Sequence, residues 1–329
     1  MYKLRRQLLI SMPALVAATP LWAQDAAANY PSRAIRFIVP YPPGGSADIL
    51  ARLIQQRLSE KFNQTVVVES KTGVGGNLGT DFVAKAPADG YIILLAGGGP
   101  MAVAKALYKE ALPYDPERDL RGVVQLAEFP MVLVANPKLV EANTPAEFIR
   151  WLKSGPDSRR TFASAGIGTP QHLVTEFFAR KLDLKLTHIP YRGTAPAVLA
   201  VVAGEVPFQF ETVTGALQQV RGGAMKAIAV TTAARAEAMP PVPTLAETVF
   251  DDFNFGTWSG IACPRGVPDA IVIKLNKALQ EILAEPAIIA KWRENGARVA
   301  GGTAADFDRF LKSETARLGG LVTELGLKP

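Results

Sequence analysis

The chain has 329 residues, of which 48% are hydrophobic and 20% charged, the composition of a soluble, well-cored protein of about two ordinary domains. The formal net charge of +6 falls to +3 when the three basic residues at positions 3, 5 and 6 are removed, and no basic stripe carries interleaved aromatic residues, so no nucleic-acid partner is expected. The single cysteine, Cys263, excludes an intrachain disulfide, and its place in WSGIACP predicts a buried strand residue.

Residues 1–28 have the pattern of an export signal. A positive start is followed by an apolar run from Leu8 to Ala18, and cleavage is expected after Ala23 or after Ala28. The arginine pair in the positive start fits either the general secretory route or the twin-arginine route. The apolar run is shorter than the ~20 residues that a membrane-spanning helix needs, and a proline interrupts it. We therefore expect an exported, periplasmic protein without an anchor.

The first part of the mature chain alternates short apolar strands with helices. The predicted strands are Ile35–Val39, Thr65–Ser70 and Tyr91–Ala96, and the predicted helices are Ala47–Phe62 and a segment within residues 74–86. In the first helix the apolar residues recur with the spacing of one helical face. This alternation predicts an α/β fold with a parallel sheet.

The same alternation continues through the second part of the chain. Strand-like segments lie near residues 130, 161, 186, 206, 225 and 256, and helical segments near 171–182, 195–204, 268–283 and 303–325. The last helices are expected to cover the first sheet. We therefore predict a discontinuous first domain, residues 30–130 and 251–329, and a second domain, residues 131–250. The segments PMVLVANP and GTWSGIACP are expected to cross between the two.

A loop rich in proline and glycine, PYPPGGSA, joins the first predicted strand to the first helix. Ligands of open α/β sheets bind beyond the carboxyl ends of the strands, which is where this loop lies. Gly44 and Gly45 leave the backbone uncovered, Ser46 is expected to cap the helix, and the N–H groups at a helix start attract an anion. The loop is either a preformed cradle for a negative group or a rigid turn that serves packing alone.

Similar junctions of strand, glycine loop and helix recur later in the chain. In TFASAGIGTPQH, Ser164 supplies a hydroxyl, Thr169 is expected to cap a helix, and Pro170 occupies the first helical position, where proline is favoured. In HIPYRGTAPAV, Thr194 is expected to cap a helix, and GVGGNLG, which contains Asn77, opens another. The recurrence in both halves favours a cleft that holds an anion from two sides.

The residues argue against an enzyme. There is no GxxxxGK[ST] motif, the glycines of residues 73–79 do not fit GxGxxG, and Ser164 lacks the upstream glycine of a nucleophile elbow. The two histidines, His172 and His188, have no metal-ligand spacing, so no metal site is expected. His188 is expected to be structural, and His172, beside a glycine loop, either packs or contacts a ligand.

Four further side chains near strand ends each have two interpretations. Arg192 either pairs with a ligand carboxylate or lies on the surface. Glu211 either receives a ligand amine or hydroxyl or faces solvent. Tyr41 and Tyr191 either line the cleft or pack in the core.

The motifs, taken in order, resemble one family. VPYPPGGSADILAR, VVVES followed by TGVGGNLGTDFVAKAPADGY, LPYDPERDL, HIPYRGTAPAV, MKAIAVTTAAR and VPTLAE resemble the Bug receptors, the periplasmic solute-binding proteins of tripartite tricarboxylate transporters. The resemblance covers residues 30–325, nearly the whole mature chain. It implies a two-lobed periplasmic binding protein of type II, a Venus flytrap with a hinge of crossing strands, which closes over a small carboxylate.

The resemblance also implies partners and a binding site. A monomer with no cofactor is expected to deliver its ligand to the membrane subunits of the transporter. In the family, backbone groups and ordered water of two loops hold the carboxylate, and these loops match residues 41–46 and 164–169. With the side chains singled out above, the predicted ligand-binding residues are Tyr41, Pro43, Gly44, Gly45, Ser46, Asn77, Ser164, Ala165, Gly166, Ile167, Gly168, Thr169, His172, Tyr191, Arg192 and Glu211.

Two positions depart from the family pattern. Ile167 stands where the family often has asparagine, and Glu211 where it commonly has aspartate. The apolar Ile167 suggests a less polar ligand, such as an aromatic mono- or dicarboxylate. Two other functions stay open: an exported hydrolase or isomerase on the same fold, and a binding protein used only for sensing.

Overall fold

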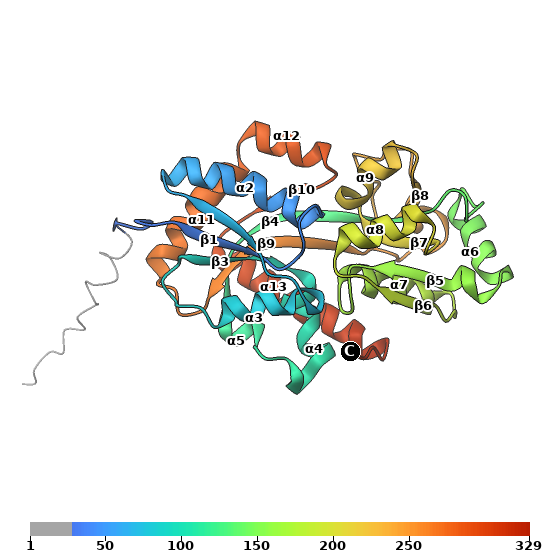
Figure 1. The fold of residues 1–329 in the computed structure, drawn as a ribbon, viewed down its shortest axis with the longest axis horizontal. Helices are drawn as coiled ribbons and strands as arrows, with labels where there is room; N and C mark the ends of the chain where they lie inside the picture. The colour runs from blue at the N-terminus through green and yellow to red at the C-terminus, as the bar shows by residue number, and fades with distance from the viewer. Residues whose placement is uncertain (1–27) are drawn as a thin grey trace, which may run out of the picture.

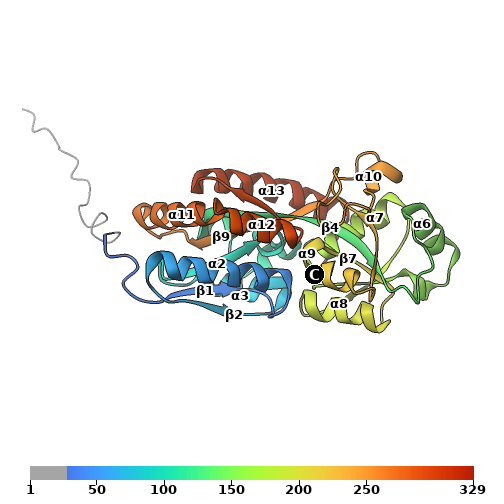
Figure 2. The ribbon, with the colours of Figure 1, turned by 90° about the horizontal axis from the view of Figure 1, so that it is seen from above.

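The structure, a computed structural model, describes residues 28–329, which form two lobes lying end to end along the long axis of the molecule (Figures 1 and 2). The predicted export signal, except for its last position, lies outside the described residues. Within residues 28–329, none of the helices combines the length and the apolar character that a membrane span requires.

The first lobe contains a mixed sheet with the strand order β2-β1-β3-β9-β4, and β10 also pairs with β4. Its strands are β1 (Ile35–Val39), β2 (Val66–Ser70), β3 (Ile92–Gly97), β4 (Leu120–Ala135), β9 (Gly256–Pro264) and β10 (Arg298–Gly301). The strands β2, β1 and β3 are mutually parallel, as the sequence predicts, whereas β9 runs antiparallel to both β3 and β4.

Helices cover both faces of this sheet because successive side chains of a strand point to opposite faces. Ile35, Phe37 and Val39 of β1 pack with helices above the sheet in Figure 1, and Ile38 packs with helices below it. The upper helices are α2 (Ser46–Phe62), α11 (Asp269–Leu283) and α12 (Pro286–Glu294). The lower ones are α3 (Asn77–Ala84), α4 (Ala104–Tyr108), α5 (Pro116–Asp119) and α13 (Ala304–Glu324).

The second lobe has its own sheet, to which β4 contributes its last five residues. The other strands are β5 (Thr161–Ser164), β6 (Thr187–Pro190), β7 (Phe208–Thr212) and β8 (Lys226–Val230). Met131 and Leu133 pack on one face, and Val132 and Val134 on the other. The helices are α6 (Pro145–Ser154), α7 (Pro170–Lys181), α8 (Thr194–Ala203), α9 (Val213–Arg221) and α10 (Leu245–Thr248). Short turns are η1 (Val74–Gly76), η2 (Gly99–Val103), η3 (Lys109–Ala111) and η4 (Asp157–Arg160).

The lobes are joined by β4, which passes from one sheet into the other. Its residues 120–130 pair with β9, and residues 131–135 pair with β7 and β8. The chain returns beside it: the Phe255 amide donates to the Thr231 carbonyl in the second lobe, and Gly256 then enters β9 opposite Pro130. We propose the domain division at this crossing, after residue 130 and before residue 256, five residues later than the predicted start at residue 251, because Phe255 still pairs with the second lobe.

The structure corrects several local expectations. Strand β4 begins ten residues before the predicted segment at Pro130, and α4, α5, α6, α9, α10, α12 and β10 were not predicted. Ser46 and Thr194 do not cap their helices: each is the first helical residue, and the preceding glycine holds the cap position. Thr169 does occupy the cap position of α7, with Pro170 next to it. Cys263 is fully buried in β9, which confirms that prediction.

Candidate functional site

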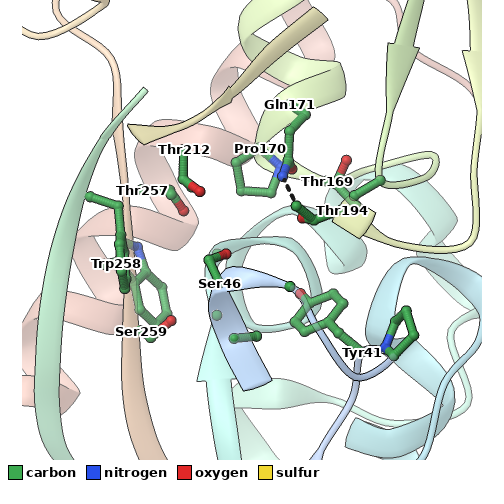
Figure 3. A pocket seen from close by; sticks show the side chains of 17 residues that line it. Tyr41, Ser46, Thr169, Pro170, Gln171, Thr194, Thr212, Thr257, Trp258 and Ser259 are labelled. Atoms are coloured by element: carbon green, nitrogen blue, oxygen red, sulfur yellow. Dashed lines mark hydrogen bonds between the residues drawn. The ribbon is translucent and has the colours of Figure 1, made fainter. Parts of the chain in front are cut away.

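A pocket of about 60 Å³ lies where the two lobes meet (Figure 3). Both lobes contribute to it, and the crossing strands form its back wall. The lining residues of the first lobe and the crossing are Tyr41, Pro42, Gly45, Ser46, Ala47, Gly97, Gly98, Phe129, Thr257, Trp258 and Ser259. Those of the second lobe are Ala165, Thr169, Pro170, Gln171, Thr194 and Thr212.

None of the 17 lining residues has a charged side chain. Instead, the N-terminal ends of four helices reach the pocket: α2 through Ser46, α7 through Pro170, α8 through Thr194 and α9 through its capping residue Thr212. The first N–H groups of a helix have no partner within the helix, and the helix dipole places partial positive charge there. The wall therefore favours an anionic ligand although it contains no positively charged side chain.

Hydroxyl groups supply the polar side chains of the wall. They belong to Ser46, Thr169, Thr194, Thr212, Thr257 and Ser259, with the Tyr41 phenol and the Gln171 amide beside them. A hydroxyl has one proton to donate, so those of Ser46, Thr257 and Ser259 can bind the carboxylate of a ligand. The hydroxyls of Thr169 and Thr212 already donate to the Gly166 carbonyl and the Glu211 carboxyl, so they can only accept from a ligand. Desolvation by burial raises the pKa of Tyr41, so its phenol stays a hydrogen-bond donor.

Three aromatic side chains, Tyr41, Phe129 and Trp258, add an apolar part to the wall. Trp258 is fixed from behind, because its indole N–H donates to the Glu314 carboxylate at 3.0 Å and its ring packs edge-to-face against Phe307. The pocket thus combines polar helix ends with flat apolar surfaces, as is usual for small-molecule sites.

Glycines allow the two lobes to touch around the pocket. A Cβ atom on Gly45 would lie 3.3 Å from the Thr194 Cβ, and one on Gly75 would lie 2.6 Å from the Ile167 carbonyl oxygen. A Cβ on Gly193 would lie 2.4 Å from Pro42. These three positions, here called the glycine seam, show that the lobes are in contact beside the pocket.

The first predicted loop is divided between the pocket and the surface. Tyr41, Gly45 and Ser46 line the pocket, whereas Pro43 and Gly44 are exposed. The Gly44 amide donates to the Asp48 side chain at 3.1 Å, so this donor stabilises the start of α2 and does not face the cleft. The loop thus brings the predicted helix start to the pocket, but the Gly44 amide does not contribute to it.

The second predicted loop lines the pocket through Ala165 and Thr169 alone. Gly166, Ile167 and Gly168 lie outside the lining, and the Ile167 side chain packs on the hydrophobic core. Hydrogen bonds on the side away from the pocket fix the conformation of this loop. The Thr169 hydroxyl donates to the Gly166 carbonyl at 2.7 Å, and the Gly166 amide donates to the fully buried Ser164 hydroxyl at 3.0 Å.

The two histidines stack on each other behind this loop. The ring centroids of His172 and His188 are 4.1 Å apart and nearly parallel, and the Ser164 hydroxyl lies 2.6 Å from Nε2 of His188. Burial lowers the pKa of His172 to about 4 and that of His188 to about 3, so both rings are neutral at ordinary pH. His172 lies outside the pocket lining, and its Nδ1 accepts from the Gly168 amide at 3.3 Å. Across residues 28–329, no cluster of three or more potential ligands is placed to hold a metal ion.

Three other predicted residues lie away from the lining. Asn77 is buried, and its amide oxygen lies 2.9 Å from the Tyr114 hydroxyl. Tyr191 is only partly buried, with its hydroxyl 3.4 Å from Glu205, and Arg192 is exposed. The positions of these residues favour the packing or surface interpretation of each.

Glu211 does not face solvent, which corrects that alternative: its exposure is 0%. It lies behind the wall, where its carboxylate accepts from the Gln171 amide at 3.1 Å and from the Thr212 backbone N–H at 2.7 Å. Burial raises the pKa of Glu211 to about 7, and the hydrogen bonds from Thr212 and Gln171 offset only part of that rise.

The predicted ligand-binding residues include five of the 17 lining residues, and the twelve that sequence reasoning missed include Gln171, Thr212 and Trp258. Thr212 carried a usable signal, because a threonine directly after a predicted strand and before a helical pattern is a favoured cap. Gln171 is the residue after Pro170, so the predicted helix start already placed it near the loop. Trp258 carried no local signal, because it reaches the pocket only through the crossing of the strands.

Comparison with known proteins gives consistent relatives. The profile of the family described as "Tripartite tricarboxylate transporter family receptor" matches residues 50–327. The chain is 34% identical to BugT of Bordetella pertussis, over 98% of each chain. An adipate-bound protein of R. palustris is 31% identical, with a TM-score of 0.88 over 91% of this chain and 99% of that one. MatC from Rhodopseudomonas palustris with bound malate is 30% identical, with a TM-score of 0.84 over 89% of this chain and 100% of that one.

Proposed function

This chain belongs to the tripartite tricarboxylate transporter receptor family, and we propose that it captures a small carboxylate in the interlobe pocket and delivers it to the membrane subunits of such a transporter. The resemblance to the Bug receptors and the two-lobed binding-protein fold are thereby confirmed. Family members of this kind are periplasmic binding proteins, and the leader of residues 1–28 is the proposed export signal for this chain.

The observation that carries the proposal is the wall of the pocket. Four helix N-termini and a group of hydroxyls converge on a space without a charged side chain. Such a wall binds an anion through N–H groups and dipoles, and a carboxylate offers the acceptor oxygens that these donors need. The adipate and malate bound to the two similar structures are both carboxylates, which supports this ligand class.

The aromatic part of the wall supports a ligand with a flat apolar body. Tyr41, Phe129 and Trp258 can contact a ring once movement of the lobes widens the pocket beyond about 60 Å³, and an aromatic pair contributes about 0.5–1.5 kcal/mol beyond its buried area. The sequence argument for such a ligand rested on Ile167, which lies outside the lining. The aromatic side chains now carry the proposal of an aromatic mono- or dicarboxylate.

Binding is expected to hold the lobes together. The ligand contacts both lobes and so favours the closed arrangement by as much as its affinity differs between the open and closed forms. The crossing of β4 and β9 serves as the hinge, and the glycine seam lets the lobes meet. Small-angle scattering should therefore show a more compact protein in the presence of a saturating ligand.

A thermal-shift screen followed by calorimetry tests the proposal. Benzoate, terephthalate, malate and adipate are compared with benzamide, which has the shape of benzoate without its charge. A ligand that binds only the folded chain raises its melting temperature, so carboxylates should do so and benzamide should not. Stabilisation by malate but not by benzoate would refute the aromatic ligand and keep the capture of carboxylates. No shift with any of the acids would refute the proposed function.

The hydrolase alternative has one observation in its favour, the short contact between Ser164 and His188. A nucleophile must be reached by its substrate, yet Ser164 is fully buried and lies outside the pocket lining. The receptor interpretation therefore stands as the conclusion. Incubation of the purified protein with benzoate esters should yield no product. Genes for transporter membrane subunits beside this one would favour transport over a role in sensing alone.

A further inference from the structure

A buried carboxyl group lies directly behind the pocket wall. Glu211 is fully buried at the end of β7, and the two residues that hydrogen-bond to it, Gln171 and Thr212, both line the pocket. A third lining residue, Thr194, packs within the same group, since a Cβ on Gly215 would touch both its side chain and the Glu211 carboxyl. An anion in the pocket and the Glu211 carboxyl are therefore separated by a single layer of side chains.

No positive group compensates this carboxyl. Among the described residues, Glu211 forms no ion pair, and its hydrogen bonds come from uncharged donors: the Gln171 amide, the Thr212 backbone, and the hydroxyls of Thr212 and Thr194. A buried charge without a cation is costly, and a second negative charge beside it raises that cost.

The elements packed around Glu211 bring few charged groups near it. The paired segments of β4 and β5 and the helix α8 contain none. The helices α7 and α9 also pack around Glu211. Their charged or titratable groups are His172, Glu176, Arg180 and Lys181 of α7 and Arg221 of α9. His172 contacts the Gly168 amide, Glu176 lies 3.8 Å from His172, and Lys181 pairs with Asp252. Arg180 of α7, Arg192, just before α8, and Arg221, in the last turn of α9, are all exposed.

We propose that capture of a carboxylate in the pocket is linked to uptake of a proton by Glu211. The inference rests on the proposed function, since it requires an anion at this site. An anion in the pocket, on the other side of Gln171 and Thr212, disfavours the ionised form of the Glu211 carboxyl. The ligand-bound protein therefore holds the proton on Glu211 more firmly than the free protein does. The burial that already raises the pKa of Glu211 to about 7 places the effect near neutral pH.

The direction of the pH dependence follows from this linkage. Because the bound form carries more protons than the free form, affinity rises as the pH falls. Ordinary ligand carboxyls titrate near pH 4, so benzoate and adipate stay largely ionised between pH 6.5 and 8.5 and contribute little to the change. Across that range we expect the Kd to weaken by about 5- to 20-fold with rising pH.

Calorimetry with benzoate and adipate at pH 7.5, in buffers of different ionisation enthalpy, measures the proton count. The wild type should take up a substantial fraction of a proton, up to about one, for each ligand bound. Glu211→Gln should bind without proton uptake and with a Kd that is flat between pH 6.5 and 8.5. Saturable binding by the wild type without proton uptake would overturn the inference and leave the proposed function intact. No binding of any acid would overturn both.

A second acid on α7 provides the matched control. Burial raises the pKa of Glu176 as well, but this residue is not part of the pocket lining. Glu176→Gln should keep the proton uptake of the wild type. Equal loss of uptake in both variants would overturn the assignment to Glu211. If Glu211→Gln does not fold, the proton count of the wild type still decides whether the linkage exists.

Discussion

The glycine seam predicts that a side chain at position 45 weakens ligand binding more than it weakens the fold. Gly45 has φ −87° and ψ 175°, a backbone conformation that any L-residue adopts. A Cβ there would already lie 3.3 Å from the Thr194 Cβ of the other lobe. The two methyl carbons of valine extend about 1.5 Å further and would overlap Thr194 when the lobes are closed.

The size of the effect follows from the cost of overpacking. Extra carbon atoms in a tight contact cost about 1–3 kcal/mol. In Gly45→Val this cost falls on the closed, ligand-bound form, because separated lobes leave room for the side chain. The Kd for the tightest acid of the panel should therefore weaken by about 5- to 150-fold. The free protein should lose no more than about 1 kcal/mol of stability, because valine is a poorer helix-capping residue than glycine.

Calorimetry and thermal unfolding of the same samples check this prediction, with Gly45→Ala as an intermediate step. Gly320 of α13 provides the control, because a Cβ at this exposed position meets open space. Gly320→Val should keep the affinity of the wild type. An unchanged Kd in Gly45→Val, or a loss of stability in the free protein as large as the loss of binding energy, would refute the reasoning.

Three further changes test other parts of the structure. Because Trp258 lines the pocket, ligand should alter tryptophan fluorescence in the wild type and in Trp151→Phe but not in Trp258→Phe; a change that persists in the last variant contradicts the pocket. Asn77→Ala breaks a buried hydrogen bond with Tyr114 and should lower the unfolding free energy in urea by about 1–3 kcal/mol, with an unchanged Kd. The folded-state pKa of Glu211, about 7, lies above its usual value near 4.3, so the stability from its neutral form is present at acid pH and is lost as the pH rises through 7. As the pH rises from 5 to 8, the unfolding free energy of Glu211→Gln should thus increase by roughly 1–3 kcal/mol relative to that of the wild type. A difference between the two proteins that does not change with pH would contradict the raised pKa.

Much of the fold could be predicted because strands and helices carry local periodicity. The strand at Ile35–Val39 and the helix that follows it were expected almost at their observed bounds. The first half of β4 was not, because LRGVVQLAE mixes glycine and charged residues with apolar ones. Its strand character depends on pairing with β9, more than a hundred residues later in the chain. No local pattern reports such a partner.

The site was predictable where it depends on strand ends and not where it depends on the approach of the lobes. Tyr41, Ser46 and Thr169 lie on loops that the rule for open sheets already indicates, and all three line the pocket. The role of the glycines differs from the expected one. The sequence suggests that Gly45 exposes donors, whereas the structure also gives it the task of admitting Thr194 from the other lobe. Such a contact depends on the tertiary arrangement, which local spacing does not encode.

The passage of β4 through both sheets has a consequence for dividing the chain into separate lobes. After a cut behind residue 130, the N-terminal fragment would lack β9, which pairs with both β3 and β4 in the first sheet. The C-terminal fragment would lack the first half of β4, which is the partner of β9. A single cut of the chain between the lobes therefore does not release the first lobe with a complete sheet.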